Sequence, residues 1–147
     1  MFIGNYSNSI DTKGRCMVPA KFRHGVGERC VIVKGFDECI YLYTEESYNK
    51  YLETHINNRP AEDDDARDLQ FFFYSNSREI ELDTQGRINL PQEYIDYAGI
   101  KKEMVNVGFG DRIEIWSKER HEAKLNSEQM DPKKLFGKML KYVPKPT

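Results

Sequence analysis

Apolar and polar residues alternate in short runs along most of the chain, and helical spacing appears in only a few places. Cys30–Lys34 and Cys39–Thr44 are rich in β-branched and aromatic residues, and Met104–Val107 and Arg112–Ser117 have the same character further along. Helical spacing follows the second of these runs, at Tyr48, Tyr51, Leu52, His55 and Ile56. Further helices are predicted over 62–74 and after Asp131-Pro132. The pattern therefore predicts a protein that mixes strands and helices.

The strand-like runs occur in two sets because the chain contains an internal repeat. Residues 11–22 align with residues 83–94, and Asp, Thr, Gly, Arg and Pro are identical between the two blocks. Residues 35–44 align with residues 108–117 at nearly the same offset. Two matching blocks in the same order indicate a duplicated unit.

Each copy begins with a short strand, a tight turn, a return strand and a short helix. Residues 11–14 and 83–86 have aspartate first and glycine fourth, which favours a type I turn with the glycine at positive φ, leading into a hairpin. Pro19 and Pro91 suit the first position of a helix, where a missing N–H costs nothing. Gly99 suits the C-terminal cap of the second of these helices.

A single copy is too small to bury both faces of its sheet or to protect its strand edges. Two copies related by a pseudo-twofold axis can close one barrel between them. We therefore expect an α+β protein, built as an internally duplicated β-barrel of two ββ-α-ββ halves with appended helices. Residues 1–75 would form the first half with its following helices, and residues 76–147 the second half with a C-terminal helix.

Composition excludes several classes of protein. The 147 residues include 22 Lys+Arg and 24 Asp+Glu, with 39% hydrophobic and 12% aromatic residues, which argues against disorder. No apolar run approaches the ~20 residues that a membrane span needs, and the N-terminus lacks the pattern of a secretory signal. The three cysteines have no paired CxxC spacing, so we expect small buried hydrophobes in a reducing cytoplasm.

The residues that commonly carry catalysis or bind metals are not arranged for either task. His24, His55 and His121 lack the spacing of metal ligands, and the acidic run 62–65 lacks the calcium-loop pattern. No serine or cysteine has a recognisable base partner. We therefore expect no enzyme activity, no metal or other cofactor, and no small-molecule substrate.

The repeated turn carries the most informative cations, Lys13, Arg15 and Arg87. One interpretation is structural, with each arginine paired to the aspartate of its own turn. The other is an outward-facing tip whose guanidinium fork binds guanine or phosphate, with glycine allowing close approach of the backbone. Residues 1–35 hold six Lys and Arg against Asp11 and Glu28, a local charge of +4 that favours the second interpretation.

The doubled signature, Asp-Thr-Lys-Gly-Arg before Pro19 and Asp-Thr-Gln-Gly-Arg before Pro91, resembles that of the bacterial MraZ proteins. These belong to the AbrB-like superfamily of swapped-hairpin barrels. The opening Met1-Phe2-Ile3-Gly4 and the length also agree, so the resemblance covers essentially the whole chain. It implies a cytoplasmic, nucleoid-associated transcriptional regulator. Such a protein would bind repeated G-rich elements upstream of a division and cell-wall gene cluster and repress its own operon.

The resemblance also implies a ring-shaped homo-oligomer that presents its signature loops to double-stranded DNA. Carried onto this sequence, the DNA contacts would fall on Lys13, Gly14, Arg15, Gln85 and Arg87. Several identical loops on one assembly would raise avidity by roughly 10²–10⁴. The alternative class is an oligomeric interaction module, antitoxin-like or a scaffold, whose basic loops would bind an acidic protein partner.

Two further segments invite interpretation. Phe71–Tyr74 is predicted to belong to the core or to a subunit interface rather than to a ligand site, and of these two the interface is favoured. The C-terminal lysines are predicted to lie on a solvated helix face, with auxiliary contact to phosphate as the alternative; they are Lys133, Lys134, Lys138, Lys141 and Lys145.

Overall fold

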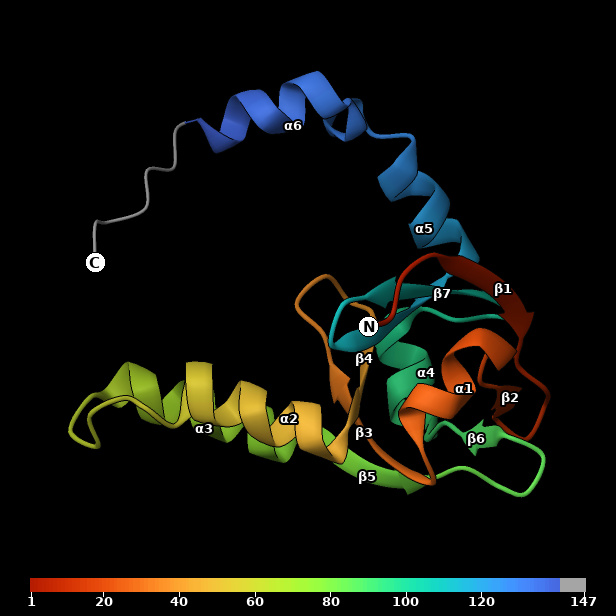
Figure 1. Cartoon of the computed structure of the whole chain (residues 1–147), viewed down its shortest axis with the longest axis horizontal. Helices are drawn as coiled ribbons and strands as arrows, with labels where there is room; N and C mark the ends of the chain where they lie inside the picture. Colours follow the sequence, from red (N-terminus) through yellow and green to blue (C-terminus); the bar gives the residue numbers. More distant parts are fainter. Residues whose placement is uncertain (141–147) are drawn as a thin grey trace.

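The computed structural model describes residues 1–140, and Lys141 and Lys145 lie outside this range. Its helices and strands alternate in an α+β arrangement (Figure 1). In chain order the elements are β1 (Asn5–Ser9), β2 (Arg15–Met17), α1 (Ala20–Val26), β3 (Arg29–Lys34), β4 (Ile40–Thr44), α2 (Glu45–Tyr51), a π-helical turn (Leu52–Ile56), α3 (Asp64–Ser75), β5 (Ser77–Glu81), β6 (Arg87–Asn89), α4 (Gln92–Ala98), β7 (Glu103–Phe109), β8 (Arg112–Ser117), α5 (Lys118–Leu125), a 3-10 turn (Glu128–Met130) and α6 (Pro132–Met139).

The strands form an antiparallel sheet in the order β1-β7-β8-β4-β3-β5 and a separate ribbon of β2 and β6. The equivalent strands of the two copies are β1 and β5, β3 and β7, and β4 and β8. Exchanging the labels within each pair reverses the strand order, as expected for a pseudo-twofold axis between β4 and β8. The first strand of each copy pairs with the other copy, β1 with β7 and β5 with β3. The duplication therefore folds as two interleaved halves.

The repeated turns have the expected conformation, but the expected local hairpin is wrong. Gly14 and Gly86 have φ of +82° and +80°, and each donates its N–H to the aspartate carbonyl three residues earlier. The return strand β2 pairs with β6 of the other copy instead of with β1. The reason is burial, because Cys16 and Ile88 reach the common core only when the copies interleave. The strands lie in two sheets, so closure into a barrel stays a prediction.

Helix ends follow the sequence signals closely. The hydroxyl oxygens of Thr44 and Ser117 cap α2 and α5 by accepting backbone N–H groups, as expected from their positions. Gly99 ends α4 in the left-handed region at φ +66°. Pro19 and Pro91 lie one residue earlier than expected, at the N-cap of α1 and α4.

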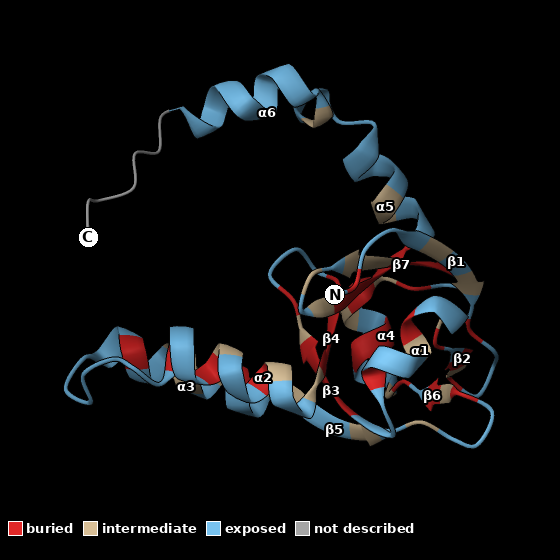
Figure 2. Cartoon of the chain, in the orientation of Figure 1, coloured by how far each residue is buried: buried red, intermediate tan, exposed pale blue. Residues whose placement is uncertain are grey.

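The core has two parts, one on each face of the six-stranded sheet. The larger part packs the sheet against α1, α4 and the ribbon, and includes Phe22 and Tyr94. The smaller part packs β3, β4 and β8 against the α2–α3 pair. These three strands are buried on both faces (Figure 2). Burial on both faces explains the nearly continuous apolar sequence of β3 and β4, whereas β8 includes the buried Glu114, which is paired with Arg112.

All three cysteines are buried and free, as expected for small hydrophobes. Burial raises the pKa of the Cys16 thiol to about 12, so this thiol is protonated and unreactive at neutral pH. The aromatic run of α3 divides by exposure, because Phe73 is buried whereas Phe71 and Tyr74 are 75% and 57% exposed.

The C-terminal helices leave the body of the protein as an arm. Asp131 caps α6, and every residue of that helix is exposed (Figures 1 and 2). Within residues 1–140, no helix has both the length and the apolar character needed to cross a membrane.

Replacing Gly14 with alanine is expected to destabilise the fold by roughly 1–3 kcal/mol, because strain at positive φ adds to a clash with the second copy. An added Cβ would lie 2.8 Å from the backbone oxygen of Leu90. Gly110→Ala is the control, since its φ is +75° and nothing lies within 4 Å of the added Cβ. Urea unfolding measures both variants, and equal losses would contradict the role assigned to the contact with Leu90.

Candidate nucleic-acid interface

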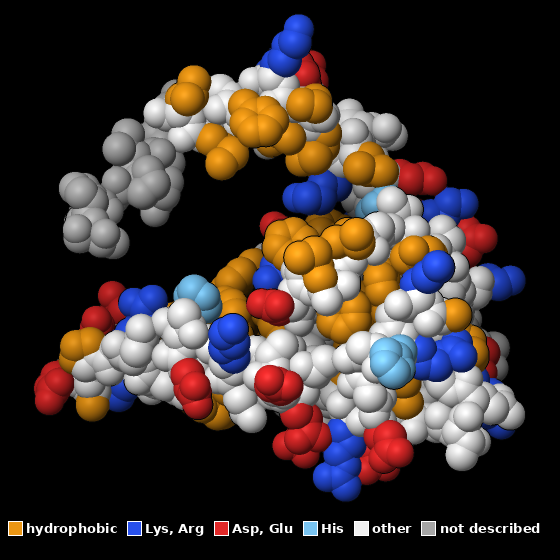
Figure 3. Space-filling model, viewed as in Figure 1, with side chains coloured by type: hydrophobic (Ala, Val, Ile, Leu, Met, Phe, Trp, Pro, Cys, Tyr) orange, Lys and Arg blue, Asp and Glu red, His pale blue; other side chains and the backbone are white. Residues whose placement is uncertain are grey.

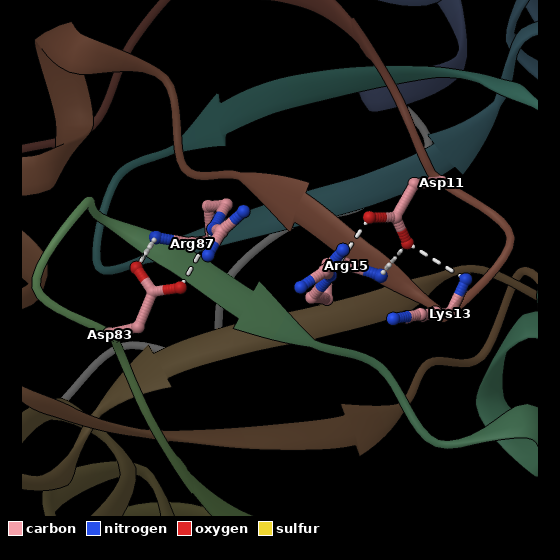
Figure 4. Close-up of polar contacts among 5 residues, drawn as sticks. All are labelled: Asp11, Lys13, Arg15, Asp83 and Arg87. Carbon is pink, nitrogen blue, oxygen red and sulfur yellow. Dashed lines mark hydrogen bonds and ion pairs between the residues drawn. The ribbon is translucent and has the colours of Figure 1, made fainter.

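The two signature turns share one hydrogen-bonding scheme. Oδ1 of Asp11 accepts the backbone N–H groups of Lys13 and Arg15, both at 2.9 Å, and Oδ2 accepts Nε–H of Arg15 at 2.9 Å. Asp83 repeats the scheme with the backbone N–H groups of Gln85 and Arg87, and with Arg87 Nε at 2.7 Å. Figure 4 shows the two ion pairs on neighbouring strands, with both guanidinium groups between the aspartates.

Both interpretations of the arginines hold for different atoms of the same side chain. The Nε edge of Arg15 and of Arg87 is held by its own aspartate. The terminal Nη atoms of these two arginines make no hydrogen bond within residues 1–140, and the side chains are 37% and 31% exposed. An exposed ion pair contributes little to stability, so its main effect here is to orient the guanidinium. Each arginine is therefore fixed along one edge and open along the other.

The ribbon places both arginines on the same face. Its register pairs Arg15 with Asn89 and Met17 with Arg87, whereas Cys16 and Ile88 between them point into the core. Residues directly opposite each other in an antiparallel pair lie on one face, and so do residues two apart. The outer face of the ribbon therefore carries two guanidinium groups in a diagonal arrangement.

The other predicted contact residues differ in their placement. Lys13 and Gln85 are exposed within their turns, and their side chains make no hydrogen bond within the described part of the chain. Gly14 is buried, and its carbonyl accepts the N–H of Leu90 at 2.8 Å. The close approach that this glycine allows is therefore to the second copy of the repeat.

The positive charge counted over residues 1–35 does not gather in one place. Arg29 forms an ion pair with Glu81 at 3.4 Å, and Lys34 lies over the rings of Tyr94 and Tyr97. The Arg23 side chain packs against Gly86, where an added Cβ would clash with Nε of Arg23. The net charge of residues 1–35 therefore indicates the candidate DNA-binding residues less well than the repeated signature does.

Arg23 has a role that sequence reasoning missed. Its Nη2 donates to the carbonyl of Val18 at 3.1 Å, and its side chain supports the second turn. The equivalent residue in the second copy is Ile95, which lies beside the first turn in the same way. The mismatch between arginine and isoleucine in the repeat alignment is the signal that could have identified this packing position.

The turns lower the pKa of their aspartates. For Asp11 the chief cause is the hydrogen bond from the Arg15 backbone N–H, supported by the Arg15 side chain and the Lys13 N–H. For Asp83 the corresponding groups of Arg87 lead. Both carboxylates are therefore ionised at neutral pH, as the ion pairs require. No group of three or more His, Cys, Asp or Glu among residues 1–140 could hold a metal ion.

Acid is expected to weaken the turns. A pKa lowered by folding contributes stability that is present above the unfolded carboxyl value, 3.8 here, and that is lost as pH falls through the folded value. The free energy of unfolding from urea titrations should therefore fall below about pH 4, and less steeply in the double variant Asp11→Asn/Asp83→Asn. Carboxyl titration by NMR with midpoints at or above 3.8 would contradict this account.

Comparison with known proteins finds the same repeat. The family described as "MraZ protein, putative antitoxin-like" matches the chain twice, over residues 1–72 and 73–141. A protein of Acetivibrio thermocellus named transcriptional regulator MraZ is 38% identical over 95% of this chain and 96% of its own length. Proteins of the same name from Clostridium tetani and Ligilactobacillus salivarius are 40% and 46% identical, over 95% and 84% of this chain and 96% and 85% of their own lengths. Because the family matches nearly the whole chain in two copies, this protein belongs to the MraZ family.

Proposed function

We propose that the protein is a sequence-specific, DNA-binding transcriptional regulator, without enzyme activity, and that the outer face of the β2–β6 ribbon binds DNA. The observation that carries the proposal is the pair of half-open guanidinium groups on this face. The names of the relatives, which call them transcriptional regulators, agree with it.

The chemistry of the ribbon suits guanine. With Nε bound to aspartate, each arginine directs its terminal nitrogens outward, where they can donate to O6 and N7 of guanine in the major groove. Such a bidentate contact contributes about 1–3 kcal/mol of discrimination. Lys13 adds a mobile charge that suits phosphate, and Gln85 offers an uncharged amide at the equivalent place. The second loop therefore has the weaker electrostatic attraction.

This chemistry is compatible with the specific DNA elements that the family resemblance implies. The regulator would bind repeated G-rich elements upstream of a division and cell-wall gene cluster, and would repress its own operon while associated with the nucleoid. One ribbon with three cations binds DNA weakly at physiological salt, so repeated elements require several ribbons in one assembly.

Self-association, with a ring as its closed form, is the second part of the proposal. The α6 arm exposes Leu135, Phe136 and Met139, of which Phe136 and Met139 are 69% and 66% exposed (Figure 3). Exposed apolar patches of this kind mark interaction surfaces. Contact between the arm and a second copy would remove these side chains from water.

A receiving surface lies between α2 and the β7–β8 turn. It is a hollow of ≈ 580 Å³, lined in part by Met1, Tyr43, Tyr51, His55 and Phe109. The hydroxyl of Tyr43 is buried there and makes no hydrogen bond within residues 1–140. The rest of the lining is largely polar and includes Lys50, Asp111 and Arg112, so the hollow suits an inserted side chain that makes both apolar and polar contacts.

The words "antitoxin-like" in the family description favour a second candidate function, an oligomeric interaction module. We infer an acidic protein as its partner from the exposed cations of the ribbon. The same exposed cations would serve it. Sequence preference distinguishes the two, because only the DNA regulator should prefer G-rich duplexes over others of equal length and charge.

Arg15→Ala is expected to abolish sequence-specific DNA binding and to leave folding and assembly unchanged, because the exposed Arg15–Asp11 pair adds little stability. Arg87→Ala should also weaken sequence-specific DNA binding. The measurement is a gel shift at fixed salt against duplexes with one, two and three G-rich elements. Arg59→Ala is the control, since it removes an equal charge from an exposed residue before α3, bonded to the His55 carbonyl. Full affinity in the Arg15 variant would reject the assignment.

The double variant Phe136→Ser/Met139→Ser is expected to shift the protein to smaller assemblies, because it removes the apolar face of α6. Light scattering coupled to size exclusion gives the mass. Lys134→Ser/Lys138→Ser on the same helix serves as the matched control. An unchanged mass in the first variant would exclude α6 from the assembly contact.

A further inference from the structure

The two ends of the ribbon are chemically different although the repeat makes them equivalent in position. At one end Arg15 lies opposite Asn89, and at the other Arg87 lies opposite Met17. Asn89 and Met17 are the same position of the two copies, so an exact duplication would have placed one residue type at both. The outer face therefore has a direction, with an amide at one end and a thioether at the other.

Asn89 is placed to act together with the first loop. Its side chain is exposed and makes no hydrogen bond within residues 1–140. Its amide oxygen lies over the first turn, 3.1 Å from where a Cβ of Gly14 would be. The group of Lys13, Arg15 and Asn89 is thus assembled from both copies of the repeat.

We propose that Asn89 is a base-reading residue that determines specificity at the base pair next to the guanine bound by Arg15. This inference rests on the proposed DNA-binding function. Asparagine is the side chain that donates to N7 and accepts from N6 of adenine in a bidentate contact, whereas arginine does the same work at guanine. The end with Arg15 and Asn89 therefore reads two adjacent base pairs, a guanine and an adenine.

The opposite end lacks this second contact. Met17 has no strong donor or acceptor in its side chain. Arg87 therefore has no amide directly opposite it in the ribbon, and the amide on that end is Gln85, which lies in the turn at the place of Lys13. The two ends of the ribbon therefore present different groups to DNA, and a single copy of the protein recognises a non-palindromic element.

Selection from a library of random duplexes tests the proposal without prior choice of an element. The wild-type protein is expected to select a motif with an adenine next to a guanine. Asn89→Ala should lose the preference for adenine by roughly 5- to 150-fold while keeping the guanine. Arg15→Ala should lose the guanine. Asn58→Ala is the matched control. Asn58 is an exposed asparagine in the loop between the π-helical turn and α3, and its side chain donates to the Thr54 carbonyl.

A gain-of-function variant completes the test. Met17→Asn should add a preference for a second adenine, related to the first by the pseudo-twofold axis of the ribbon. Circular dichroism and thermal unfolding verify that each variant folds.

Two results would overturn the inference and leave the proposed function standing. They are an Asn89→Ala motif identical to that of the wild type, and a uniform loss of affinity over all positions of the motif. A wild-type protein that selects no motif at all would overturn both the inference and the proposed function.

Discussion

The exchange of strands between the two copies is the constraint on which the rest of the structure depends. A lone copy would leave the inner faces of β2 and the sheet in water, whereas interleaving buries Cys16 and Ile88 in one core. The two turns are joined across the pseudo-twofold axis by matched bonds, Val18 N–H to Gly86 O and Leu90 N–H to Gly14 O. Because each turn is anchored to the other copy, its exposed side has a fixed orientation for binding.

Rigidity of the backbone and openness of the side chain are combined in each signature turn. The aspartate satisfies two backbone N–H groups and one edge of the arginine. Arginine would otherwise lose side-chain entropy on binding, and a side chain already oriented loses less. The repeated Asp-x-x-Gly-Arg pattern is therefore a means of presenting a guanidinium group in a defined direction.

Divergence between the copies has produced different surfaces on one symmetric frame. Gln85 replaces Lys13, Asn89 replaces Met17, and Ile95 replaces Arg23 at equivalent positions. The buried ribbon positions Cys16/Ile88 and Val18/Leu90 keep their apolar character, because a change there would disturb both copies at once, whereas Arg23/Ile95 is a packing position that differs. Positions that face solvent are free to differ, and they give the ribbon its two distinct ends.

The sequence by itself determined the duplication, the α+β class, the turn conformation at Gly14 and Gly86, and the caps at Thr44 and Ser117. These features depend on local chemistry, which a short segment carries in full. Only the tertiary structure decided that β2 pairs with β6 and that Asn89 joins Arg15. It also decided that the charges of Arg29 and Lys34 are engaged by Glu81 and by tyrosine rings. Pairing between distant strands depends on burial summed over both copies, and no local pattern records that sum.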